Sequence, residues 1–272
     1  MTQVLALANQ KGGVGKTTTA VNLSAYLAAR GCQILLIDID PQGNATSSLG
    51  VDKETCDLSI YDVLNDRLPL LDAVVPVGQD LPRLAIVPST SVLLGAETEA
   101  ALTTADERER RLAEALTTLP RGFYDLIVID CPPSLGLLTL NALTAAEGVI
   151  IPIQCEFLAL EGLAQLANNI ELVKRTFNQR LDILGVLLTM YDGRTRLSAQ
   201  VADEVRRFFP NRLFETAIPR GVHLAEAPSY GQSILHYDPA SRGALAYSAV
   251  ADETLARLHL VAPAPVAAEV LR

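Results

Sequence analysis

Short apolar runs alternate with longer stretches in which apolar residues recur at helical spacing. The apolar runs predict strands at residues 4–8, 33–40, 84–88, 124–130, 148–153, 181–190 and 214–218. The remaining pattern predicts helices at residues 19–29, 60–64, 97–119, 158–177, 198–209 and 243–258. Because strands and helices alternate, we expect a single-domain, doubly wound α/β fold with a mainly parallel sheet and helices on both faces. This domain is expected to span residues 1–258, and the Pro/Ala-rich residues 259–272 are expected to form a flexible tail.

The composition restricts where the protein is expected to act. With 272 residues, of which 49% are hydrophobic, the chain can bury one large core. It has no apolar run of the ~20 residues that a membrane-spanning helix needs. No charged-then-apolar signal peptide opens the chain, so we expect a cytoplasmic protein without a membrane partner.

The four cysteines are widely spaced and form no C-x-x-C pair. They are Cys32, Cys56, Cys131 and Cys155. This spacing argues against a zinc site or a disulfide scaffold. We expect four reduced thiols in or near the core.

A glycine-rich octet lies between the first predicted strand and the first predicted helix. It reads Lys11-Gly12-Gly13-Val14-Gly15-Lys16-Thr17-Thr18. Its glycines allow backbone N–H groups to converge on an anion, and the start of the following helix favours negative charge. A loop of this kind binds the phosphates of a nucleotide, with Lys16 reaching the β- and γ-phosphates and the Thr17 hydroxyl ligating Mg²⁺.

Acidic residues follow two of the predicted strands. Asp38 and Asp40 end the strand at 33–40, and Asp130 ends the strand at 124–130. Ligands of open parallel sheets bind at the carboxyl ends of the strands, so Asp130 is expected to hold Mg²⁺ there, through a water. Asp38 and Asp40 fit the same site, but they also fit a purely structural role as caps of the turn at 41–44.

The octet departs from the usual phosphate-loop pattern in a way that resembles a known family. Gln10 replaces the first glycine, and a second lysine, Lys11, stands at the mouth of the loop. Together with residues 38–44, 130–134 and 226–231, this loop resembles the deviant Walker A ATPases, and within them the ParA/Soj chromosome- and plasmid-partition ATPases. The resemblance extends from about residue 3 to about residue 258.

The resemblance implies a Mg²⁺-dependent ATPase that forms an ATP-bridged homodimer. Lys11 would reach the phosphates bound by the other subunit, and Lys16 would act within its own. Asp40 would position or activate the hydrolytic water, while Asp38 would support the metal and its loop. The expected metal residues are therefore Thr17, Asp38 and Asp130, and the expected catalytic residues are Lys11, Lys16 and Asp40. Residues 11–18 would bind the phosphates, with Met190, Pro219 and Gly221 at the base.

The resemblance also implies binding of non-specific double-stranded DNA in the ATP state. Because the net charge is −9, such binding requires a local basic patch. The expected contacts are Arg194, Arg196, Arg206, Arg207, Arg220 and Arg242, although each also fits the role of an ordinary solvated arginine. A ParB-like partner would stimulate hydrolysis, and the protein would be associated with the nucleoid.

One stretch departs from the family. Where partition ATPases commonly have Pro-Arg-Asn-Val-Arg, residues 219–223 read Pro219-Arg220-Gly221-Val222-His223. Gly221 lacks the amide that would contact adenine. His223 replaces an arginine expected to contact DNA, and an unperturbed imidazole (pKa about 6.5) is mostly neutral at neutral pH.

Four alternatives remain. A related ATPase could position another cargo with the same fold and dimer. A MinD-type ATPase cycles on membranes through a basic amphipathic C-terminal helix, which residues 259–265 do not resemble. A synthetase would need a second substrate site, for which we expect no extra domain. Iron proteins of the nitrogenase type bridge a cluster with paired cysteines, whose surroundings are not matched here.

No helix-turn-helix precedes the loop, so we expect no specific operator binding.

Overall fold

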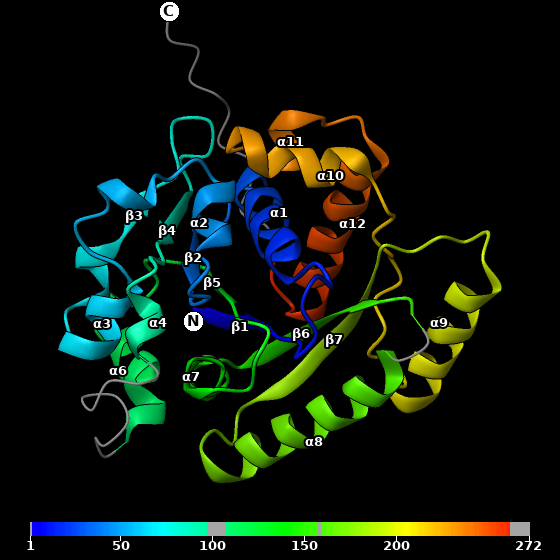
Figure 1. The fold of residues 1–272 in the computed structure, drawn as a ribbon, viewed down its shortest axis with the longest axis horizontal. Coiled ribbons are helices and arrows are strands. Elements are labelled where there is room, and N and C mark those ends of the chain that lie inside the picture. The colour runs from blue at the N-terminus through cyan, green and yellow to red at the C-terminus, as the bar shows by residue number, and fades with distance from the viewer. Residues whose placement is uncertain (1, 97–106, 157–158, 262–272) are drawn as a thin grey trace, which may run out of the picture.

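The computed structural model describes residues 2–96, 107–156 and 159–261, and its centre is a seven-stranded sheet (Figure 1). The strand order is β3-β4-β2-β5-β1-β6-β7. The strands are β1 (Gln3–Leu7), β2 (Ile34–Asp38), β3 (Val75–Pro76), β4 (Leu84–Val87), β5 (Leu126–Asp130), β6 (Gly148–Gln154) and β7 (Asp182–Thr189). All pairings are parallel except that of β3 with β4. The expected mainly parallel α/β fold is confirmed.

Helices cover both faces of this sheet (Figure 1). They are α1 (Lys16–Ala29), α2 (Asn44–Ser48), α3 (Ile60–Asp66), α4 (Leu93–Ala96), α6 (Arg111–Thr117), α7 (Leu137–Ala145), α8 (Ala159–Thr176), α9 (Arg196–Phe208), α10 (Val222–Glu226), α11 (Ile234–Tyr237) and α12 (Arg242–Arg257). Short 3-10 turns occupy Lys53–Thr55, Leu70–Ala73, Arg108–Arg110 and Ala227–Tyr230.

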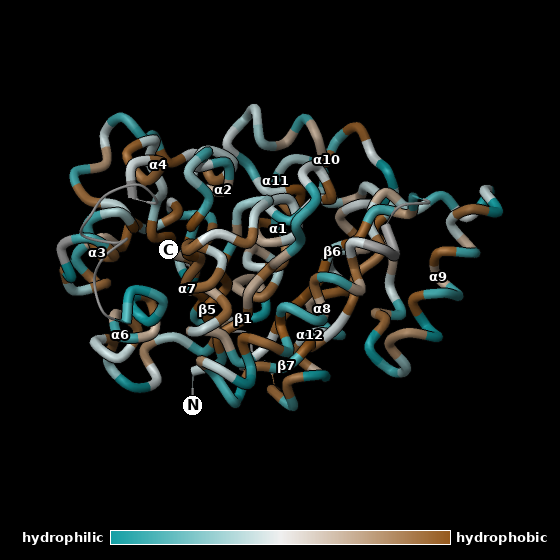
Figure 2. The backbone as a smooth tube through the Cα atoms, turned by 60° about the horizontal axis from the view of Figure 1, so that its bottom comes forward, coloured by the Kyte–Doolittle hydropathy of each residue, from teal (hydrophilic) through white to brown (hydrophobic). Residues whose placement is uncertain are grey.

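Alternate residues of β1 contribute to two separate cores. Leu5 and Leu7 belong to the core that includes Leu23 of α1 and Tyr247 of α12. Ala6 belongs to the opposite core, with side chains from α7 and α8. This alternation is the period of a strand buried on both faces. Hydrophobic segments accordingly run through the central strands in Figure 2.

One predicted element is wrong, and two others lie partly outside the described residues. Residues 214–218 do not form a strand, because the Glu253 carboxylate accepts the backbone N–H groups of Glu215 (2.9 Å) and Thr216 (3.3 Å). Only isolated bridges remain on either side, Val186 with Leu213 and Tyr191 with Pro219. Of the helix predicted at 97–119, residues 97–106 lie outside the described residues, and α6 covers a short part of the rest. Most of the tail at 259–272 is likewise outside them.

The strand register brings the acidic residues to one edge of the sheet. Asp38 pairs in register with Asp130 across β2 and β5, and Leu7 pairs with Asp130 across β1 and β5. The glycine-rich octet follows β1 directly, so the loop and both aspartates meet at the carboxyl ends of the central strands.

Two further features of the described residues bear on function. Cys32, Cys131 and Cys155 are buried, Cys56 is half-buried, and all four are free thiols. Within the described ranges, no helix has the length and apolar character needed to cross a membrane.

Candidate functional site

Residues 11–16 form a tight loop between β1 and α1. Gly13 (φ 73°) and Gly15 (φ 87°) adopt left-handed conformations that a side chain would strain. The α1 helix begins at Lys16, immediately after Gly15. The buried side chain of Lys16 turns back over the loop, and its Nζ donates a hydrogen bond to the Lys11 carbonyl at 3.2 Å. Burial lowers the pKa of Lys16, and the nearby Asp130, Cys131 and Asp40 partly oppose this shift. The loop therefore encloses a cationic, backbone-lined space for phosphate.

Asp130 lies beside this loop at the end of β5 and is fully buried. Among the described residues, neither of its carboxylate oxygens has a hydrogen-bond partner of normal geometry, although the Thr17 hydroxyl is close enough to lower its pKa. Burial is the larger effect and, with the charge of Asp38, raises the pKa of Asp130 well above its usual value. A buried carboxylate without partners is costly unless a cation accompanies it. Asp130 and Thr17 thus fit a Mg²⁺ ion with part of its water shell.

Asp38 has a different environment, because its oxygens already accept hydrogen bonds. The Thr46 N–H (2.9 Å) and hydroxyl (2.8 Å) donate to Oδ2, and the Asp40 N–H (3.2 Å) donates to Oδ1. Burial raises the pKa of Asp38 to about 6, although these bonds favour its charged form. These hydrogen bonds let Asp38 fix the loop that carries Asp40. Asp38 would therefore support a metal site by holding this loop in place.

Asp40 is also buried near the phosphate loop. Its Oδ1 accepts the Gln42 N–H at 3.0 Å, which shows that the turn-capping reading is correct for this residue. The other carboxylate oxygen of Asp40 can still accept a hydrogen bond, for example from a water molecule. The capping and water-positioning readings are therefore compatible.

The second lysine of the loop, Lys11, has an acidic partner within the same chain. Its ammonium forms an ion pair with Glu156, just beyond the end of β6. The backbone N–H of Lys11 donates to the Asn9 side chain at 3.0 Å. The Lys11 side chain is 45% exposed, so its charge remains accessible at the mouth of the site.

The three residues expected at the base line one small cavity. Met190, Pro219 and Gly221 surround about 230 Å³ together with Gly15 and Thr18 of the loop. The loop is joined to this wall by Thr189, whose hydroxyl donates to the Val14 carbonyl at 2.8 Å. The cavity therefore lies next to the phosphate loop, where a nucleotide base would be held.

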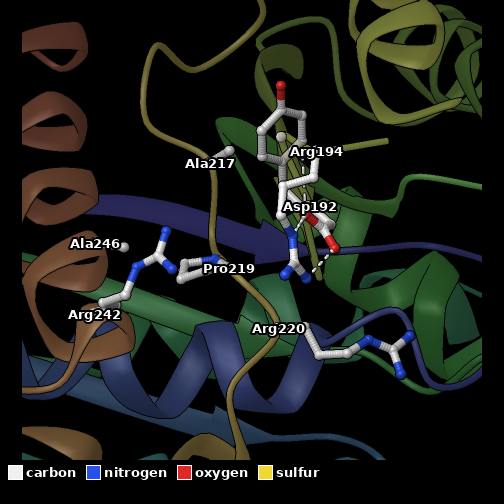
Figure 3. Close-up of a pocket in the computed structure, with 9 residues that line it drawn as sticks. Asp192, Arg194, Ala217, Pro219, Arg220, Arg242 and Ala246 are labelled. Carbon is white, nitrogen blue, oxygen red and sulfur yellow. Dashed lines mark hydrogen bonds and ion pairs between the residues drawn. The ribbon is translucent and has the colours of Figure 1, made fainter. Parts of the chain in front are cut away.

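Three of the arginines expected to bind DNA line a larger pocket of about 640 Å³ (Figure 3). The Arg194 side chain is 90% exposed and forms a two-point ion pair with Asp192. Its Nε donates to Oδ1 at 2.9 Å, and its Nη2 donates to Oδ2 at 2.7 Å. This contact lowers the pKa of Asp192 to about 2. Arg220 contributes from the segment between α9 and α10, and Arg242 from the start of α12.

The other expected contacts with DNA lie apart from this pocket, on α9. Arg196 begins the helix, while Arg206 pairs with Asp203 (3.0 Å) and Arg207 with Glu204 (2.7 Å) on its exposed side. His223 forms a short contact with Asp238, so a carboxylate already engages the imidazole that replaces the family arginine. These ion pairs reduce the net positive charge that the region offers.

The stretch at residues 226–231 has a structural explanation. Gly231 (φ 63°) packs so closely on Gly50 that a Cβ at position 231 would lie 2.7 Å from the Gly50 Cα. This contact packs the 3-10 turn at Ala227–Tyr230 against α2 and the turn that follows it. The α2 helix belongs to the segment that follows Asp40.

Sequence reasoning missed Thr46, Thr189 and Glu156, which position Asp38, the phosphate loop and Lys11. Glu156 carried a signal, because it is an acidic residue just past the carboxyl end of a predicted strand. Thr46 and Thr189 carried none, since a threonine hydroxyl gives no pattern along the chain.

Comparison with known proteins places this chain in a family. A family model described as an AAA domain matches residues 2–183. The chain is 51% identical over 256 residues to the sporulation initiation inhibitor protein Soj of Bacillus subtilis, covering 94% of this chain and 99% of the relative. It is 49% identical over 256 residues to the chromosome partitioning protein ParA of Caulobacter vibrioides, covering 94% of each. A crystal structure of cobyrinic acid a,c-diamide synthase from Mycobacterium smegmatis, with bound ADP and magnesium, aligns with a TM-score of 0.82 and 40% identity over 95% of this chain and 96% of that one. The chain belongs to the Soj/ParA family of chromosome-partitioning proteins.

Proposed function

We propose that this protein is a Mg²⁺-dependent partition ATPase that dimerises around ATP and binds DNA without sequence preference in that state. The observation that carries the proposal is the convergence of three features at one sheet edge. The glycine-rich loop brings the Lys16 ammonium back over its own backbone, and a second lysine, Lys11, lies at its mouth. The buried carboxylate of Asp130 beside the loop lacks a hydrogen-bond partner of normal geometry among the described residues. Each feature suits one part of a bound MgATP.

The groups around the phosphates act by positioning and charge. Backbone N–H groups of the loop and the Lys16 ammonium would hold the β- and γ-phosphate oxygens. Thr17 and Asp130 would hold the metal ion, which neutralises charge on the β- and γ-oxygens when bound. Asp40, fixed by its own turn, would orient the attacking water toward the γ-phosphate.

Lys11 gives the proposed dimer its nucleotide dependence. The Lys11 side chain is partly exposed at the mouth of the loop, where a second subunit could approach. Its ammonium would contact the phosphates in that subunit, so the γ-phosphate becomes part of the interface. Hydrolysis would then weaken the dimer, and a ParB-like partner would set the time at which this happens.

The proposed DNA surface is the pocket of Arg194, Arg220 and Arg242. Guanidinium groups bind phosphates through several donors and carry no sequence information by such contacts. With a net charge of −9, the remainder of the protein does not attract DNA, so the interaction depends on this patch and on low salt. The proposed location is the cytoplasm, on the nucleoid.

Two alternatives use the same fold. A partition-type ATPase for another cargo would share every feature described above and differ only in its partner. A synthase activity is suggested by the name of the solved structure at 40% identity, whereas the curated partition proteins reach about 50%. The higher identity favours partition.

Charge reversal tests the DNA surface. Arg194→Glu should lower the affinity of the ATP-bound protein for random-sequence duplex by at least about tenfold at low salt, and leave ATP binding within about twofold of wild type. Arg175→Glu is the matched control, because Arg175 is an exposed, paired arginine at the far end of α8. Equal DNA binding by both variants would show that the surface lies elsewhere.

A further inference from the structure

A lysine from outside the phosphate loop holds the turn that carries Asp40. Lys53 begins the 3-10 turn Lys53–Thr55, which follows α2 in the chain. Its ammonium donates to the Gln42 carbonyl at 2.9 Å. Since Gln42 lies just before α2, the chain that leaves this helix returns to its start. Lys53 therefore closes a loop around α2 and fastens it to the turn at Asp40.

Gln42 links this lysine to the Asp40 carboxylate. The Gln42 N–H donates to Asp40 Oδ1 at 3.0 Å, while the Gln42 carbonyl accepts the bond from Lys53. The Gly43 N–H then donates to the Asp40 carbonyl at 2.8 Å. Both polar groups of the Gln42 backbone thus bond to a charged side chain, and hydrogen bonds of this kind are roughly twice as strong as neutral ones. A shift of Gln42 would therefore be passed to the carboxylate.

The aliphatic stem of Lys53 packs against the same turn. Gly43 has a left-handed backbone (φ 61°, ψ 35°), and a Cβ at this position would lie 2.6 Å from Lys53 Cδ and 2.7 Å from the Ser89 carbonyl oxygen. Gly43 is therefore in close contact with both residues. Ser89 is fully buried, and its N–H donates to the Thr46 hydroxyl at 3.0 Å. The turn thus has the buried backbone of Ser89 on one side and the Lys53 stem against it as well.

The start of the Lys53 side chain is itself fixed by its neighbours. The Asp52 carboxylate caps the 3-10 turn by accepting the Glu54 N–H at 3.0 Å. The Val51 N–H donates to the Thr46 carbonyl at 3.2 Å, which ties this segment to α2. A lysine on such a base loses less freedom when its ammonium is bound than one on a mobile loop.

We infer that Lys53 is a positioning residue for ATP hydrolysis, which acts on the attacking water through Gln42 and the Asp40 carboxylate. The inference rests on the proposed ATPase function and adds a residue outside the phosphate loop to it. Because Lys53 acts through Asp40, its contribution belongs to the hydrolytic step and not to nucleotide binding. Gln42 is exposed, so water can replace the ammonium at its carbonyl. Removal of the charge should therefore loosen the turn without unfolding the protein.

The test compares Lys53→Met with Lys53→Arg in the full chain. Methionine keeps most of the aliphatic stem but has no donor, whereas arginine keeps both charge and donors. We expect Lys53→Met to lower the single-turnover rate of Mg²⁺-dependent ATP hydrolysis by about three- to tenfold and to leave the Kd for ATP within about twofold of wild type. Lys53→Arg should recover most of this loss. Lys174→Met is the matched control, because Lys174 is another partly exposed lysine, paired with Asp182 at 3.5 Å.

Two further measurements separate positioning from a structural role. ADP with aluminium fluoride and Mg²⁺ mimics the phosphoryl group during transfer. Lys53→Met should bind this complex about three- to tenfold more weakly than wild type, while its affinity for ADP stays unchanged. Light scattering should show the same ATP-dependent dimer, so that the slower hydrolysis does not arise from weaker association.

The outcomes distinguish this inference from the proposed function. If the wild type hydrolyses ATP and Lys53→Met does so at the same rate, the inference fails while the ATPase proposal stands. It also fails if Lys53→Met loses ATP affinity in proportion to its loss of activity, or if Lys53→Arg is as slow as Lys53→Met. If the wild type hydrolyses no ATP, the proposed function itself fails.

Discussion

Lys11 and Glu156 of the same subunit form an ion pair across the mouth of the phosphate loop. Lys11 is the residue that the proposed dimer needs for contact with the other subunit. In the proposed dimer, Glu156 would therefore compete for the Lys11 ammonium with the phosphates bound in the partner. Both side chains are 45% exposed, so the pair is weak enough to exchange.

We expect Glu156→Gln to favour dimerisation. Exposed ion pairs contribute ~0–1 kcal/mol, so the ATP concentration that gives half-maximal dimer should fall by about two- to fivefold. Light scattering against ATP concentration would measure this. Glu171→Gln, which removes a comparable exposed pair with Arg175, is the control and should change nothing. A weaker dimer in Glu156→Gln would mean that Glu156 assists the interface rather than competing with it.

Asp130→Asn should stabilise the metal-free protein. The substitution removes a buried charge without a normal hydrogen-bond partner, and we expect the free energy of unfolding to rise by about 1–3 kcal/mol. The effect of Mg²⁺ on ADP binding should disappear in the same variant. Denaturant unfolding with and without Mg²⁺ and ADP measures both effects.

Asp125→Asn serves as the control for this experiment. Asp125 lies just before β5, and its carboxylate accepts the Gln33 N–H at 2.8 Å. Asparagine keeps an oxygen that can accept this bond but loses the charge that strengthens it, so Asp125→Asn should lose a little stability, the opposite sign from Asp130→Asn. If both variants lose stability, Asp130 has a structural partner that our account omits.

Asp38 should make the metal-free protein less stable as the pH rises. Its folded pKa of about 6 exceeds the unfolded value of about 3.9, so the folded state binds the proton more tightly. The resulting contribution is complete below about pH 4 and is lost as the pH rises through about 6. Asp38→Asn should flatten the dependence of unfolding free energy on pH in this window, whatever its effect on overall stability. An unchanged slope would show that Asp38 is charged throughout.

The Gly231–Gly50 contact predicts a steric cost that can be separated from backbone strain. Gly231→Ala should destabilise by about 2–4 kcal/mol, because it combines a positive φ with a Cβ placed 2.7 Å from the Gly50 Cα. Gly78→Ala shares the positive φ (77°) but meets nothing within 4 Å, and should cost only about 1 kcal/mol. Urea unfolding of both variants gives the difference. Equal losses would mean that the turn at Gly231 relaxes away from Gly50.

Patterns along the chain predicted much of the fold, because strands buried on both faces leave continuous apolar runs. They did not predict α7, whose leucines and alanines surround the helix and give no amphipathic face. They also misassigned residues 214–218, where the competing partner, Glu253, lies on a helix distant in sequence. Such contacts exist only after the fold has formed.

The candidate site divides in the same way. The octet at 11–18 and the aspartates at strand ends follow from local patterns, since loop and strand termini bring them to one edge. The contacts that position them do not. The hydrogen bond from Thr46 to Asp38 and the ion pair between Asp192 and Arg194 join residues whose contacts leave no pattern along the chain. They can be seen only in the assembled structure.

The most direct test of our central claim is the nucleotide dependence of DNA binding. Random-sequence duplex would be titrated with the Asp40→Ala variant, which should retain ATP without turnover, in the presence of ATP, ADP or no nucleotide. We predict binding with ATP alone, weakening steeply with salt. Binding that is equal in all three states, or absent in all three, would contradict it.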